Sequence, residues 1–411
     1  MVRGQTARHG GARQELARDK LPYAKVEPPC PYFGTCGGCA LQDVSYEDQL
    51  ALKRQRLRRV LAGVKDAPPC ELIPLDDPWR YRNKLELTFG QVDGHLTLGL
   101  HAARSFWRVV DLDDCLLAPV EMASVLRAVR SLADRTGLPA YHPRTHHGFF
   151  RHLLLRFSQT TGQLLVCIIT APGHQEAIEP LARALAAMHS KIASIYWGTT
   201  SRIADVAWPD SLTLLHGAAH LEDRVGPFHL EVLPLSFLQP AGAQADRLYT
   251  HLCQSLGDRP RATAWDLYCG VGLVGLYVSR YVERVYGIDV EPTHVEQARR
   301  HATLNGMANM EFRAGRVETL LMDRRFWLQE AKPDLIVVDP PRAGLHPRAL
   351  TSLLAARPKT LAYLSCNAQS LARDLQALGD GFPRYHLREL RAFDMFPQTP
   401  HVEVLAILER T

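Results

Sequence analysis

Two residues of reactive type stand where ordinary packing does not account for them. Cys366 lies between an apolar run and a helical stretch, where a helix N-terminus favours the reactive thiolate form. Glu403 interrupts the apolar run 402–408, where an unpaired buried carboxylate is costly. These residues could serve as a nucleophile and a proton acceptor. The alternatives are an inert packed cysteine and a carboxylate at an exposed sheet edge.

A glycine-rich segment, residues 266–275, joins one apolar run to the next helical stretch. Gly270, Gly272 and Gly275 permit a tight turn and a close approach of the backbone to a ligand. About twenty residues later, Asp289 ends the next predicted strand, where its carboxylate could bind both hydroxyls of a ribose. The pattern indicates a nucleotide-containing cofactor, and dinucleotides and S-adenosylmethionine share it.

Two further features favour S-adenosylmethionine as that cofactor. Asp266 precedes the glycines, and the fourth predicted strand of the region ends in a rigid polar corner, Asp339-Pro340-Pro341-Arg342. Such a corner lies where a donated methyl group and its acceptor would meet, although Asp339 could also be a capping or turn residue.

A nucleophilic thiol, a carboxylate base and a sulfonium donor together suit methylation of carbon 5 of uracil. Addition of the Cys366 thiolate to carbon 6 would make carbon 5 nucleophilic, and Glu403 would remove the remaining proton. The target base must be unpaired or flipped out of its helix for this chemistry.

Four sequence strings resemble the RNA 5-methyluridine methyltransferase family, and they occur in that family's order: DLYCGVGLVGL, VVDPPRAGL, LSCNAQSLARDL and FDMFPQTPHVEVLAIL. The similarity runs from Cys30 to the end of the chain. It implies Cys366 as nucleophile and Glu403 as base in an S-adenosylmethionine-dependent RNA (uracil-5-)-methyltransferase. It also implies contacts to S-adenosylmethionine from Gln239, Tyr268, Asp289 and Asp339. The chain departs from the family's commoner pattern at Ala241, Leu273 and Ala368.

A cysteine group near the N-terminus has metal-ligand spacing. Cys30, Cys36 and Cys39 follow the pattern C-x5-C-x2-C, and Cys115 is the best candidate for a fourth ligand. Four thiolates suit an iron–sulfur cluster or zinc, and the spacing alone leaves both open. The group resembles the [4Fe-4S] site of the ribosomal-RNA members of the family. The resemblance therefore implies a structural [4Fe-4S] cluster and 23S rRNA as substrate, with tRNA as the alternative.

The regular alternation of apolar runs and amphipathic stretches after residue 263 predicts a doubly wound α/β sheet. The resemblance implies the class I, Rossmann-like methyltransferase form of this fold. We expect a flexible tail over 1–26, a cysteine segment with a basic helix over 27–69, an α+β central RNA-binding domain over 70–230 and the catalytic domain over 231–411. The central domain would also supply Cys115.

Charge points to the same kind of partner. The first 62 residues hold 11 Lys and Arg against six Asp and Glu, so the net charge of +5 lies entirely in this segment. This positive segment would attract a phosphate-rich partner; the alternative is that its charges only form a solvated face. The predicted helix 45–61 carries Lys53 and four arginines on its polar face, and Arg82 and Lys84 share one face of a strand and could line an RNA path.

The remaining sequence patterns say less about function. The cluster His142, His146, His147 and His152 has no carboxylate within it and is interpreted as a surface loop. No apolar run approaches the ~20 residues of a membrane-spanning helix, and no signal peptide is apparent. We therefore expect a cytoplasmic protein that binds no membrane. We also expect a monomer. The rival functions are methylation of an exocyclic nitrogen, NAD-dependent dehydrogenation, and RNA binding by a metal-stabilised protein without catalysis.

Overall fold

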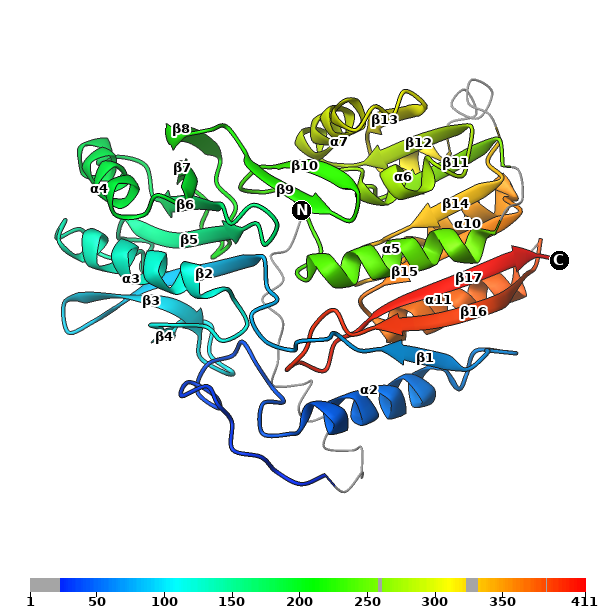
Figure 1. Ribbon diagram of the computed structural model, residues 1–411, viewed down its shortest axis with the longest axis horizontal. Helices are drawn as coiled ribbons and strands as arrows, with labels where there is room; N and C mark the ends of the chain where they lie inside the picture. Colours follow the sequence, from blue (N-terminus) through cyan, green and yellow to red (C-terminus); the bar gives the residue numbers. More distant parts are fainter. Residues whose placement is uncertain (1–22, 258–260, 323–331, 382) are drawn as a thin grey trace.

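The computed structural model describes residues 23–257, 261–322, 332–381 and 383–411. Most of the predicted N-terminal tail lies outside these ranges. Two sheets dominate the molecule, with the seven-stranded sheet of the central domain beside the eight-stranded sheet of the catalytic domain (Figure 1). Among the described residues, we find no helix with the length and hydropathy needed to cross a bilayer.

The catalytic sheet has the predicted doubly wound form. Its strand order is β1-β16-β17-β15-β14-β11-β12-β13, and every strand except β17 runs in the same direction. The strands are β11 (Thr263–Leu267), β12 (Arg284–Asp289), β13 (Met310–Ala314), β14 (Leu335–Val338), β15 (Thr360–Ser365), β16 (Tyr385–Phe393), β17 (Glu403–Arg410) and β1 (Cys70–Ile73). The apolar runs that alternate with amphipathic stretches after residue 263 form β11 to β15, which confirms the predicted alternation.

Helices cover both faces of this sheet because both sides of each central strand are apolar. In β11, Ala264 packs into one core with Leu252 and Leu276, whereas Trp265 packs into the opposite core with Leu57 and Leu353. The first face carries α5 (Gly242–Leu256), α6 (Leu273–Val278) and α7 (Pro292–Leu304); the second carries α8 (Val317–Leu320), α10 (Pro347–Ala356), α11 (Ala368–Asp380) and α2 (Tyr46–Leu61) (Figure 1).

The central domain is a mostly antiparallel sheet of order β4-β3-β2-β5-β6-β7-β8, covered on one face by α3 (Val120–Asp134) and α4 (Gln175–Met188). Leu85, Leu87 and Phe89 are buried against these helices, as the alternation in their strand predicts. The hairpin β9 (Leu221–Val225) and β10 (Phe228–Val232) packs beside α5. The sheet strands are β2 (Lys84–Val92), β3 (His95–His101), β4 (Val109–Asp111), β5 (Phe150–Phe157), β6 (Leu164–Thr170), β7 (Ile192–Thr199) and β8 (Ser211–Gly217).

Three details differ from expectation. Residues 70–73, placed in the central domain by the sequence, form β1 at the edge of the catalytic sheet by pairing with β16. Lys53, predicted on the exposed face of its helix, is buried because its ammonium pairs with Asp394 at 2.6 Å. His152 is not part of a surface loop: it is buried in β5, and its ring lies 3.2 Å from a carboxylate oxygen of Asp205.

Candidate active site and cysteine pocket

The carboxyl ends of the parallel strands meet at the edge of the catalytic sheet that faces the central domain (Figure 1). Leu267 of β11 pairs with Ile288 on one side and with Val338 on the other. The residues that follow these three are Tyr268, Asp289 and Asp339. Three of the predicted site residues therefore lie next to one another at this edge.

The predicted nucleophile and base come from neighbouring strands. Ser365, the last residue of β15, pairs with Val404 of β17 in antiparallel register. One further step along this register sets Cys366 beside Glu403. Cys366 is partly exposed, whereas Glu403 is 1% exposed. The Oε1 atom of Glu403 has no hydrogen-bond partner among the described residues.

Burial dominates the electrostatics of this edge. It raises the pKa of Cys366 to about 12, together with the nearby Glu403 carboxyl, while the Arg342 guanidinium acts in the opposite direction. Burial also raises the pKa of Asp339 to about 7 and that of Glu403 well above its ordinary value, the latter with help from Asp339. Ionisation of any one of these three acidic groups disfavours ionisation of the other two, and Arg342 is the cation beside them. Such perturbed pKa values are typical of catalytic sites.

Arg342, the last residue of the polar corner 339–342, is a functional candidate that its sequence context does not reveal. Its backbone carbonyl accepts a hydrogen bond of 2.9 Å from the side chain of Asn367. Asn367 also caps α11, since its Oδ1 accepts from the backbone of Gln369 at 3.1 Å. The residue after Cys366 therefore fixes the turn that holds Arg342 near the thiol.

Replacing Arg342 with Met should raise the pKa of Cys366 further and lower its thiolate fraction. A rise of one pKa unit lowers that fraction about tenfold, and we expect alkylation of Cys366 by iodoacetamide at neutral pH to slow by about this factor. Peptide mass mapping after timed alkylation measures the rate, with the exposed Arg348→Met of α10 as matched control. Equal rates in both variants would rule out an effect of Arg342 on the thiol.

The glycine turn after β11 is built to approach a ligand. Gly270 has φ +53°, and the space that a side chain would occupy there is open. Its N–H donates to Asp289 Oδ2 at 2.9 Å, and the other oxygen of Asp289 accepts from the backbone of Glu291 at 2.9 Å. Burial opposes ionisation of Asp289, yet His294 and these two N–H groups hold its pKa below the ordinary value. A charged acceptor therefore faces the turn.

Tyr268 and Gln239 are fixed by their backbones. Tyr268 has φ +63°, a left-handed conformation that is costly for a bulky side chain and concentrates at functional sites. Gln239 is buried before α5, and its carbonyl accepts a hydrogen bond of 2.8 Å from Asn83 of the central domain. The central domain thus helps to place a residue expected to contact the cofactor.

Comparison with known proteins identifies the family. Residues 215–411 match the model of the tRNA (uracil-5-)-methyltransferase family. An RNA methyltransferase of Halalkalibacterium halodurans, named as uncharacterized, is 33% identical over 94% of this chain and 84% of its own length. A similarly named protein of Chlorobaculum tepidum is 35% identical over 94% of this chain and 83% of its own length. This chain belongs to the uracil-5 RNA methyltransferase family.

A solved structure agrees with that assignment. The tRNA (uracil-54, C5)-methyltransferase of Pyrococcus abyssi, in complex with S-adenosyl-L-homocysteine, matches with a TM-score of 0.72 and 28% identity. The match covers 90% of this chain and 85% of the archaeal one. The present protein is thus an S-adenosylmethionine-dependent RNA (uracil-5-)-methyltransferase, and its α/β fold is that of the family. The family assignment contradicts two rival functions, NAD-dependent dehydrogenation and RNA binding without catalysis.

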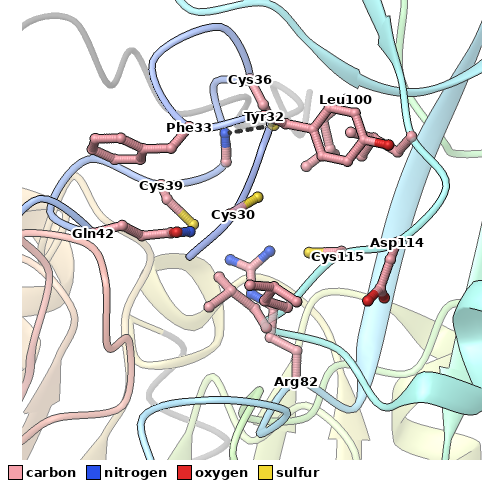
Figure 2. Close-up of a pocket in the computed structure, with 14 residues that line it drawn as sticks. Cys30, Tyr32, Phe33, Cys36, Cys39, Gln42, Arg82, Leu100, Asp114 and Cys115 are labelled. Carbon is pink, nitrogen blue, oxygen red and sulfur yellow. Dashed lines mark hydrogen bonds between the residues drawn. The ribbon is translucent and has the colours of Figure 1, made fainter. Parts of the chain in front are cut away.

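The four predicted metal-binding cysteines of the methyltransferase line one pocket. Cys30, Cys36, Cys39 and Cys115 surround one recess, and their sulfur atoms face its interior (Figure 2). Within the described ranges, no three His, Cys, Asp or Glu side chains are arranged as a group able to hold a metal ion. The thiols share the recess without converging on one point.

Arg82 also reaches into this pocket. It was expected to line an RNA path, but its guanidinium lies among the thiols (Figure 2). Burial raises the pKa of Cys36 to about 11 and that of Cys39 to about 12, and Arg82 acts against both shifts. A positive side chain beside four thiols favours the ionised forms that metals bind.

The backbone approaches the pocket closely at two glycines. A Cβ atom at Gly37 would lie 2.9 Å from the carbonyl of His101, and one at Gly38 would lie 2.9 Å from Leu100. The N–H of Gly38 donates to the sulfur of Cys36 at 3.3 Å. Four thiols around one recess and a hydrogen bond to sulfur are features that clusters held by thiolates share, and the thiols would have to converge for a cluster to bind.

Proposed function

We propose that this methyltransferase forms 5-methyluridine in 23S rRNA through a covalent adduct between Cys366 and carbon 6 of the target uracil. The observation that carries the proposal is the position of a partly exposed cysteine, directly after β15, beside a buried carboxylate at the start of β17, whose Oε1 has no hydrogen-bond partner among the described residues. Each of these groups has a distinct task in the reaction, whereas a pair that served only packing would not require a buried carboxylate oxygen without a hydrogen-bond partner among the described residues.

The reaction begins when the Cys366 thiolate adds to carbon 6, which moves the ring electrons toward carbon 5 and its neighbouring carbonyl. S-adenosylmethionine supplies the methyl group that carbon 5 takes. Glu403 then removes the proton left on carbon 5, the electrons of that bond restore the ring double bond, and sulfur departs with the electrons of the S–C6 bond. Gln239, Tyr268, Asp289 and Asp339 are the residues proposed to hold the donor.

The test is methyl transfer to RNA by the purified enzyme. We expect label from S-adenosylmethionine to appear in 5-methyluridine, identified by mass analysis of the nucleosides, and mapping in a deletion strain to show loss of one or more such sites in 23S rRNA. Methylation confined to tRNA would favour the second candidate, which the match to the archaeal tRNA enzyme supports. Label on an exocyclic nitrogen would overturn both.

We also propose that Cys30, Cys36, Cys39 and Cys115 hold a [4Fe-4S] cluster, with zinc as the alternative. The purified protein should be brown and contain about four iron and four sulfide per chain. Cys36→Ser should lose most of this metal, whereas Cys253→Ser, at a buried cysteine of α5 outside the pocket, should keep it. Metal analysis that finds one zinc and no iron would contradict the cluster.

A further inference from the structure

The segment 394–402 links β16 to Glu403, the first residue of β17, and is called the base loop here. Its main partners come from the opposite end of the chain. They are residues of α2 and the short stretch that follows Cys39. The position of the predicted base therefore depends on contacts from a segment that belongs to the cysteine region.

Gln49 of α2 lies at the centre of these contacts and is 1% exposed. Its Nε2 donates to Gln398 Oε1 at 2.9 Å, and its Oε1 accepts from the Gln398 backbone at 3.0 Å. The carbonyl of Gln398 accepts from Ala40 at 2.9 Å and from Leu41 at 3.1 Å. Gln398 has φ +66°, a conformation that these bonds hold in place.

Lys53 makes a second attachment one turn further along the helix. Its buried ammonium donates to Asp394 at 2.6 Å and to the carbonyl of Phe396 at 3.1 Å. Tyr46 donates to the other oxygen of Asp394 at 3.0 Å. The start and the middle of the base loop are thus bound to α2, and neither attachment involves β15, which precedes Cys366.

We propose that Gln49 and Lys53 are positioning residues for the Glu403 carboxylate. The inference rests on the proposed adduct mechanism. Addition of the Cys366 thiolate to carbon 6 and methylation of carbon 5 by the donor need no proton acceptor. The final step needs Glu403 at the carbon 5 proton, so that the C–H electrons re-form the ring double bond and the S–C6 bond breaks toward sulfur. Loosening the base loop should therefore slow the final step selectively.

Gln49→Met, which keeps the side-chain volume and removes its hydrogen bonds, tests the inference on RNA with ordinary uridine and saturating donor. We expect adduct formation to stay within about threefold of the native rate, while product release falls by about 100-fold, a loss that a displacement near 1 Å can cause. A protein–RNA complex that survives denaturation should then accumulate. The exposed Glu47→Ala on the same helix is the matched control.

Tyr46→Phe, which removes a single hydroxyl from Asp394, should shift the same ratio in the same direction and keeps the test decisive if Gln49→Met does not fold. Equal slowing of both steps, or unchanged product release in a folded variant, would overturn the inference alone. A native enzyme that forms no adduct with RNA containing 5-fluorouridine would overturn the proposed mechanism itself.

Discussion

Cys366→Ala should form no covalent complex with RNA that contains 5-fluorouridine, and its turnover should fall by more than about 10⁴-fold, as expected when a nucleophile is removed. Fluorine at carbon 5 cannot be lost as a proton is, so the native enzyme should be trapped as an adduct that survives denaturing electrophoresis. The sulfur of Cys366 is the atom that bonds to carbon 6. Without that bond carbon 5 does not become nucleophilic, and Glu403 cannot replace the thiol in this step.

The control for this experiment is Cys70→Ala, at a partly exposed cysteine on β1. It should be trapped as efficiently as the native enzyme. Because burial and the Glu403 carboxyl raise the pKa of Cys366 to about 12, its thiolate fraction should grow with pH across the neutral range. The rate of trapping should grow with it. A covalent band that persists in Cys366→Ala would remove this residue from the mechanism.

Glu403→Gln should complete the first half of the reaction and stall in the second. Loss of a proton acceptor costs about 10²- to 10⁴-fold, and we expect turnover to fall within that range while a methylated adduct accumulates on ordinary uridine. The isosteric amide fills the buried site and cannot take the carbon 5 proton. Denaturing electrophoresis with labelled donor measures the accumulated adduct.

Glu409→Gln, at the far end of the same strand, is the control for that variant. The raised pKa of Glu403 also has a consequence in the native enzyme. The carboxyl is protonated at pH values where an ordinary glutamate is charged, so the proton-removal step should accelerate as pH rises through the elevated pKa. Normal turnover in Glu403→Gln would exclude it as the base.

The sequence predicted most of the catalytic fold because its signals are local. Each strand from β11 to β15 is a short apolar run followed by a helical stretch, and the turn glycines lie within the same segment. β1 escaped prediction because its four residues carry no such pattern and acquire a partner only from β16. The burial of Lys53 has the same origin, since Asp394 lies 341 residues away along the chain.

In the candidate site, too, local signals could be found in the sequence and long-range contacts could not. Cys366 and Glu403 could be singled out because each residue type conflicts with its local pattern. Arg342 received no role and Arg82 was assigned to an RNA path because an arginine fits any polar stretch. Only the folded chain places one beside a nucleophile and the other among the pocket thiols. Similarly, His152 of β5 meets the carboxylate of Asp205, which lies in the segment between β7 and β8.

The pairing of α2 and β1 with the last strands of the sheet has a consequence during synthesis. At a translation rate of roughly 5–20 residues per second, the ribosome needs on the order of tens of seconds to make the chain between Lys53 and Asp394. Throughout that interval the apolar side of α2, with Leu50, Leu57 and Leu61, lacks its binding surface. The helix made first can therefore reach its final position only after the last strands of the sheet have been synthesised.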